Sequence, residues 1–301
     1  MSTTKNWLQQ NVTTSNMTRT RRASGYTIVE VMIVLAVSSL MFLIAANFIS
    51  GRQQSNAFRV GTNELAQRIQ STLEEVNDGQ YSDIPLTCTV SGSGVPTASV
   101  PVGPASPTQG TNANGCVFMG KLMHFRVADV QTNYETFSLA GSQKDSTGKL
   151  ATGYQSASPT VISGLTKSQT VPQNLNVQSV VAYNTVGATY HSFDIGFIQN
   201  FGQVDTSSGI TSNSVYQNGA QSISLVYTTG LNNTSDSAAA AGSLTPSSNI
   251  IVAQAAYVCV TDDTYYARIN IGGEQSGTGN QQNRLAVTVQ VIDKATWTAQ
   301  C

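Results

Sequence analysis

Residues 26–50 read YTIVEVMIVLAVSSLMFLIAANFIS, and this stretch decides how the rest of the chain is interpreted. Its only charged residue is Glu30. A helix needs about 20 mostly apolar residues to cross the hydrocarbon core of a bilayer, and this stretch is long enough. We therefore expect residues 26–50 to form a transmembrane helix.

The residues before this stretch are basic. Residues 1–25 contain Lys5, Arg19, Arg21 and Arg22 and no acidic residue. Because positive flanks stay on the cytoplasmic side, we expect the N-terminus inside and the rest of the chain outside the membrane.

Two ordinary alternatives exist for this segment. It could be a secretory signal peptide cleaved near Ala45 or Ala46, or a simple signal anchor. Neither explains Glu30, because a carboxylate in an apolar run is costly and usually has a function. A twin-arginine export signal at Arg21-Arg22 fits poorly, because the flanking residues do not match.

The string RRASGYTIVE, residues 21–30, resembles the processing site of type IV prepilins and pseudopilins. That family has a basic leader ending in Gly, then an aromatic or apolar residue, often Phe, and a Glu at the fifth mature position. Gly25, Tyr26 and Glu30 occupy these places. Tyr instead of Phe and a longer leader are departures from the pattern.

The resemblance implies that a prepilin peptidase removes residues 1–25 by cutting between Gly25 and Tyr26, and that the Tyr26 amine is N-methylated. Gly25 has no side chain, so a protease can approach its backbone closely. An amine and a carboxylate in hydrocarbon each need a partner. In the family, the Glu of one subunit is thought to neutralise the N-terminus of a neighbour, which makes Glu30 the candidate assembly residue.

The helical pattern continues through residues 51–78. One face of this segment is apolar, with Phe58, Leu65, Ile69, Leu73 and Val76. Their spacing predicts an amphipathic helix that ends near Gly79 as its C-cap. A helix from about Thr27 to Asn77 would be roughly 75 Å long at 1.5 Å per residue.

Residues 79–301 are expected to form a globular, β-rich head. Its proline-rich stretch, residues 91–115, predicts a long surface loop. From residue 116 onward strand signals dominate, and they predict strands at 116–129, 134–139, 179–184, 192–199, 222–228, 250–261, 265–271 and 284–292. The fold class is therefore α+β: a long N-terminal helix packed on a mainly antiparallel sheet, as in pilins.

The four cysteines are Cys88, Cys116, Cys259 and Cys301, and four cysteines allow three pairings. An outside location permits disulfides. The economical pairing is Cys88–Cys116 with Cys259–Cys301; free buried thiols are the alternative.

The composition narrows the classes of function. Charged residues make up 10% of the chain and the net charge is −1, which suits a cell-surface protein and gives no strong case for nucleic acid. The sequence contains no GxSxG, HExxH, paired CxxC or Walker motif, so we expect no enzyme, no metal and no cofactor. His124 is expected to be packed in a strand, and His191 to open a strand at a surface turn. Asp262-Asp263 favours turn capping over a Ca²⁺ site.

We interpret the chain as a structural subunit, a minor pilin or pseudopilin, of a type IV pilus, type II secretion or DNA-uptake filament. Its expected partners are the prepilin peptidase, other pilin or pseudopilin subunits, the assembly platform and the membrane. It would be single-pass in the inner (cytoplasmic) membrane with the head outside, and would later join a filament at the cell surface. The alternative is a secreted or anchored binding protein or hydrolase that uses residues 1–46 only as an export signal.

Overall fold

The structure is a computed structural model. It describes residues 25–78, 87–90, 96–99, 116–125, 132–142, 147, 149, 151, 154–162, 164–183, 189–200, 215–218, 221–228, 249–272 and 285–301. The chain divides into two compact units, Met1–Arg52 and Gln53–Cys301, with the boundary inside the long helix α1 (Ile28–Asn77). Each unit is described by itself.

Helix α1 has the bounds that the sequence predicts. Its N-terminus is capped by Thr27, whose Oγ1 accepts a hydrogen bond from the Glu30 backbone N–H at 3.3 Å. The Thr27 carbonyl also accepts the first helical hydrogen bond, from the Val31 N–H at 3.2 Å. The side-chain bond satisfies one of the backbone N–H groups that a helix N-terminus leaves without a partner. The predicted long helix from about Thr27 to Asn77 is confirmed.

The α1 residues in the second unit have one buried face. This face consists of Phe58, Gly61, Thr62, Leu65, Ala66, Ile69, Thr72, Leu73 and Val76. A Cβ at Gly61 would lie 2.9 Å from the Gln173 Cβ, so this glycine allows a close approach between α1 and the segment at Gln173. The predicted amphipathic helix is therefore confirmed.

An eight-stranded antiparallel sheet forms one layer of the head, in the order β10-β11-β9-β3-β4-β5, with β12 paired to β11 and β6 paired to β4. The strands are β3 (Cys116–Phe125), β4 (Asn133–Ser142), β5 (Thr160–Val161), β6 (Lys167–Thr170), β9 (Asp194–Asn200), β10 (Val215–Asn218), β11 (Gln221–Thr228) and β12 (Ile250–Ala253).

A five-stranded antiparallel sheet forms another layer, in the order β15-β14-β13-β7-β8. Its strands are β7 (Asn176–Tyr183), β8 (Thr189–Ser192), β13 (Ala255–Thr261), β14 (Tyr266–Gly272) and β15 (Ala286–Ile292). The remaining elements are the hairpin of β1 (Thr87–Val90) and β2 (Pro96–Ser99), the helices α2 (Tyr154–Ala157) and α4 (Lys294–Gln300), and a 3₁₀ turn, η2 (Pro172–Asn174).

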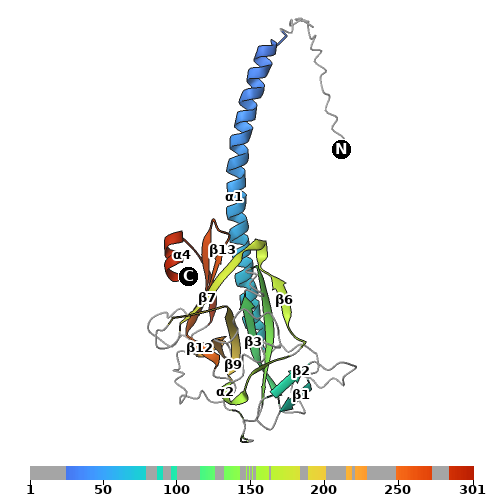
Figure 1. Ribbon diagram of the computed structural model, residues 1–301, viewed down its shortest axis with the longest axis vertical. Coiled ribbons are helices and arrows are strands. Elements are labelled where there is room, and N and C mark those ends of the chain that lie inside the picture. The colour runs from blue at the N-terminus through green and yellow to red at the C-terminus, as the bar shows by residue number, and fades with distance from the viewer. Residues whose placement is uncertain are drawn as a thin grey trace, which may run out of the picture. The chain divides into compact units, whose positions relative to one another are not determined.

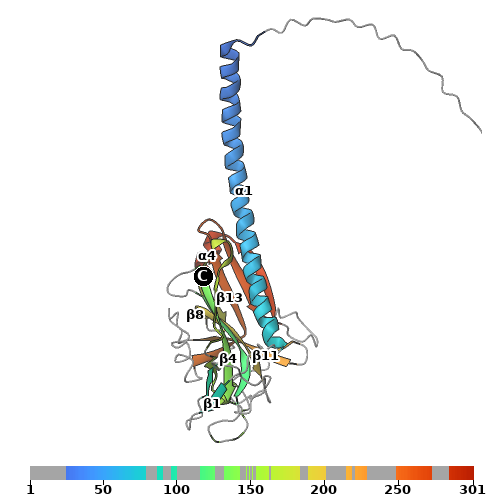
Figure 2. The same ribbon diagram turned by 90° about the vertical axis from the view of Figure 1, so that its right-hand side faces the viewer.

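The main core lies between the buried face of α1 and one face of each large sheet (Figures 1 and 2). Representative members are Leu65 on α1, Phe197 on β9 and Val258 on β13, all fully buried. The other face of each sheet also carries an apolar cluster. On the eight-stranded sheet that cluster includes Tyr154 of α2. On the five-stranded sheet it includes Trp297 of α4.

The chain passes directly from one sheet to the other at two bends. Phe193 separates β8 from β9, and Gln254 separates β12 from β13. At the second bend the Gln254 N–H donates to the Tyr183 carbonyl at 2.8 Å. The sequence predicts one strand over 250–261, and this is wrong at Gln254, where the chain changes sheets. The run of mostly apolar residues continues on both sides of Gln254 and gives no sign of the break.

Other elements also differ from the expectation. Residues 96–99 form β2, so the predicted loop 91–115 is not irregular throughout. Short elements at 154–157, 167–170 and 189–192 were not expected, nor was helix α4. The mainly antiparallel α+β architecture is nevertheless as predicted.

Candidate functional site

The predicted cleavage junction lies just before α1. Gly25, Tyr26 and Thr27 have no regular secondary structure, and the helix begins at Ile28. The Tyr26 side chain is 78% exposed. The Gly25–Tyr26 peptide bond is therefore accessible and not held in helical hydrogen bonds, as a peptidase substrate requires. The proposed leader, apart from Gly25, lies outside the described residues.

Glu30 occupies the first turn of α1 and is exposed. An acidic residue there interacts favourably with the positive end of the helix dipole. Within the part of the chain that the structure describes, no hydrogen bond or ion pair to its carboxylate is formed. The charge of Glu30 is thus available to a group from outside this chain.

The first unit presents an apolar surface on every side of α1. Every residue from Gly25 to Arg52 is exposed, including the side chains of Leu35, Phe42 and Ile44. By length and composition, α1 contains a segment able to cross a membrane. An exposed apolar surface of this extent is unfavourable in water, so it requires lipid or neighbouring protein around it.

A disulfide ties the C-terminus to the head. Cys259 on β13 and Cys301 are joined with a Cα–Cα distance of 6.0 Å. Helix α4 leads to Cys301 and is capped by Asp293, whose carboxylate accepts a hydrogen bond from the Thr296 N–H at 2.9 Å. This hydrogen bond lowers the pKa of Asp293 below its ordinary value. The Asp293-x-x-Thr296 pattern was the available sequence signal for α4.

The second expected disulfide is not described. Cys88 lies on β1 and Cys116 on β3, but their side chains fall outside the described part of the structure. The Cys88–Cys116 pairing therefore stays a prediction.

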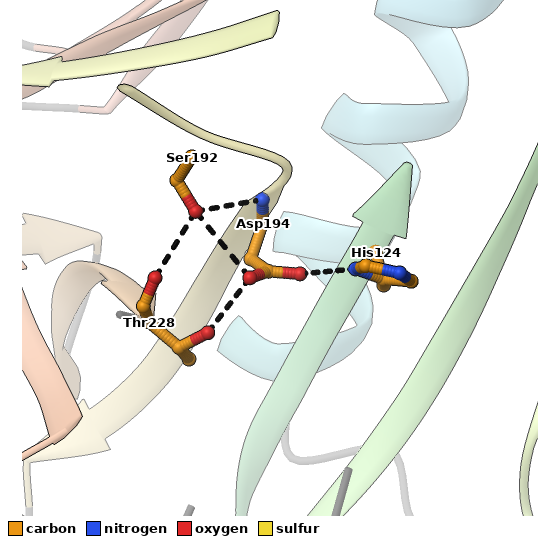
Figure 3. A network of polar contacts seen from close by, with 4 residues as sticks. All are labelled: His124, Ser192, Asp194 and Thr228. Carbon is orange, nitrogen blue, oxygen red and sulfur yellow. Dashed lines mark hydrogen bonds and ion pairs between the residues drawn. The ribbon is translucent and has the colours of Figure 1, made fainter. Parts of the chain in front are cut away.

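A polar network joins three strands of the eight-stranded sheet to the end of β8 in the other sheet, near the bend at Phe193 (Figure 3). His124 on β3 faces Asp194 on β9, with 2.5 Å between Nδ1 and Oδ1. The other carboxylate oxygen accepts hydrogen bonds from Thr228 Oγ1 at 2.7 Å and from Ser192 Oγ at 3.3 Å. His124 and Asp194 are both fully buried.

Burial raises the pKa of Asp194, and the hydrogen bond from His124 opposes that rise. A His–Asp pair can move protons when the other ring nitrogen meets a substrate or a nucleophile. Here the His124 Nε2 is buried and has no hydrogen-bond partner among the described atoms. The network instead connects β3, β9 and β11 of one sheet and, through Ser192, β8 of the other. The expectation that His124 is packed within a strand is confirmed.

The remaining candidate residues, Asp262 and His191, are parts of a turn and a strand. Asp262 Oδ1 accepts hydrogen bonds from the backbone N–H groups of Thr264 and Tyr265, at 3.0 and 2.7 Å, so Asp262 caps the turn between β13 and β14 as expected. Across the described residues, no group of three or more potential metal-ligating side chains comes together. His191 is exposed, but it lies within β8 and not at a turn.

The comparison with known families agrees with the N-terminal geometry. The family model of the prokaryotic N-terminal methylation motif matches residues 20–46. The chain therefore carries a prepilin segment of the kind found in type IV pilins and pseudopilins. No curated protein and no solved structure matches the chain.

Proposed function

We propose that this chain is a minor pilin or pseudopilin, a structural subunit of a type IV pilus, a type II secretion pseudopilus or a DNA-uptake filament. A prepilin peptidase would cut it between Gly25 and Tyr26, and the new Tyr26 amine would be methylated. Before assembly, the subunit would span the inner membrane with its head outside. It would then enter the filament through α1 with the help of the assembly platform and other subunits.

One observation carries this proposal: an exposed apolar helix begins three residues after Gly25 and holds an exposed Glu30 in its first turn. Cleavage would place a positive α-amine on Tyr26. Within apolar surroundings the amine and the Glu30 carboxylate both need an opposite charge. A neighbouring copy of the same segment supplies both charges, so assembly would satisfy them reciprocally.

The size of the head supports a minor subunit over a major one. Residues 79–301 make up most of the chain. A head of this size suits a subunit that initiates or caps a filament and meets other molecules there.

The direct test is the N-terminus of the mature protein. Mass spectrometry of protein from the native host should find a chain that starts at Tyr26, with one added methyl group on its amine. A chain that starts after Ala45 or Ala46 would instead identify an export signal, and the proposal would then be wrong.

A further inference from the structure

The outer face of the five-stranded sheet contains a hollow of about 320 Å³. Here "outer" means the face opposite the main core. The strand register explains its form. Ala255, Gly272 and Ala286 lie side by side across β13, β14 and β15 and form a row of small residues. Tyr183 on β7 continues that row at one end.

Gly272 keeps this row open. Its φ is +155°, and a Cβ at this position would lie 2.9 Å from the Ala255 Cβ. Larger residues at these positions would also fill the space directly. The hollow therefore exists because the residues in this row are small.

Arg268 lines the hollow and is held in place by neutral groups. Its Nε–H donates to Gln290 Oε1 at 2.9 Å, and Nη1 donates to Gln300 Oε1 at 2.6 Å. The guanidinium carbon lies 5.6 Å from the centre of the Tyr257 ring. No carboxylate among the described residues forms an ion pair with Arg268. Since a guanidinium has five N–H donors, an anion can still bind it.

Uncharged hydrogen-bonding groups surround this cation. The Tyr183 hydroxyl donates to the Tyr257 hydroxyl at 3.1 Å, and Tyr257 donates to the Gln300 carbonyl at 2.6 Å. Asn270 and Thr288 lie opposite one another on β14 and β15, in the row next to the small residues, and both line the hollow. An amide and hydroxyls thus stand beside a single positive charge.

We propose that this hollow binds one carboxylate-bearing sugar unit, a uronate. Its carboxylate binds Arg268, and its ring hydroxyls bind Tyr183, Asn270 and Thr288. The volume is at the lower end of small-molecule sites, so it accepts one ring and not an extended chain. One arginine matches the single charge of a carboxylate. The unit can be a free sugar acid or the end of an acidic polysaccharide, and this inference does not depend on the filament role.

The test is a calorimetric titration of the full chain in detergent with D-glucuronate, with D-glucose as the uncharged control. We expect glucuronate to bind at least tenfold more tightly than glucose. Arg268→Gln should weaken glucuronate binding at least tenfold, and Ala286→Phe should abolish it by filling the hollow. The exposed Arg59→Gln on α1 is the matched control and should bind like the parent. Circular dichroism confirms that each variant is folded.

A second titration with a glucuronate-terminated oligosaccharide distinguishes the two sources. Tighter binding of the oligosaccharide assigns the site to a polysaccharide end, and equal binding assigns it to the free sugar acid. The proposal is overturned if glucose and glucuronate bind equally, or if folded Arg268→Gln binds glucuronate as the parent does. Binding of an acidic peptide at Arg268 without uronate binding would also overturn it.

Discussion

The two segments of helix α1 differ in whether their apolar side chains are exposed or buried. In the first unit Leu35, Leu40 and Ile44 are 60–63% exposed, whereas in the second unit Leu65, Ile69 and Leu73 are 0% exposed. Apolar residues surround the first segment, but they form a single stripe on the second. A helix that is apolar all round is normally buried by something. The second segment finds its partner within the chain, and the first requires one from outside.

The largest expected effect concerns the junction before the first segment. Gly25→Leu should leave the precursor fully uncleaved, because a bulky side chain blocks the close approach of a peptidase to this backbone. Immunoblotting of membrane fractions separates precursor from mature chain. The head should unfold as in the parent, because a Cβ at Gly25 would meet no described atom within 4 Å apart from its chain neighbours. Normal cleavage of this variant would contradict the interpretation of the Gly25–Tyr26 junction as a prepilin cleavage site.

The second prediction concerns the stability of the head alone. Cys301→Ser opens a disulfide that closes a sequence separation of 42 residues. The chain-entropy relation gives a loss of about 4 kcal/mol in the free energy of unfolding. Urea unfolding of the purified protein measures it. Cleavage at Gly25 should stay normal, because the junction precedes the helix that carries the head. An unfolding midpoint equal to the parent's would show that the bridge contributes nothing.

A matched pair of truncations compares the two helical segments directly. Ile69→Ala removes a fully buried side chain and should lower the free energy of unfolding of the head by about 2–5 kcal/mol. Leu40→Ala, a truncation of similar size at an exposed position, should change it by less than about 0.5 kcal/mol. Urea unfolding of both variants in detergent makes the comparison. Equal losses would contradict the assignment of separate partners to the two segments.

The smallest effect is expected at the buried network. Because the pKa of Asp194 is raised in the folded state, its proton stabilises the fold at low pH, and that contribution is lost as pH rises through the folded pKa. The free energy of unfolding of the parent should therefore fall relative to that of Asp194→Asn as pH rises above about 4, the ordinary pKa of Asp. Urea unfolding at several pH values tests the sign. A parent that becomes more stable relative to Asp194→Asn as pH rises would contradict this prediction.

The residues that could be predicted from sequence are those whose evidence is local. Gly25, Tyr26 and Glu30 lie within one short string, and the buried face of α1 follows from its 3.6-residue period. The strands β3 and β14, expected at 116–129 and 265–271, also follow from local strand signals.

The features that could not be predicted depend on distant parts of the chain. Asp194 meets His124 across 70 positions, and no local pattern links them. Apolar residues lie on both sides of the bend at Gln254, so only the pairing of β12 and β13 with different sheets shows it. The hollow beside Arg268 arises because three small residues from three strands come into register.

The most direct test of the central claim is the role of Glu30 in assembly. We expect Glu30→Val to insert in the membrane and to be cleaved normally, because neither step needs the charge, but to be lost from the filaments. Shearing filaments from cells and comparing the sheared and membrane-retained protein measures this. Glu74→Val, which removes an exposed carboxylate from the second segment of α1, is the control and should enter filaments like the parent. If Glu30→Val enters filaments as well as the parent does, Glu30 is not the charge that docks this subunit.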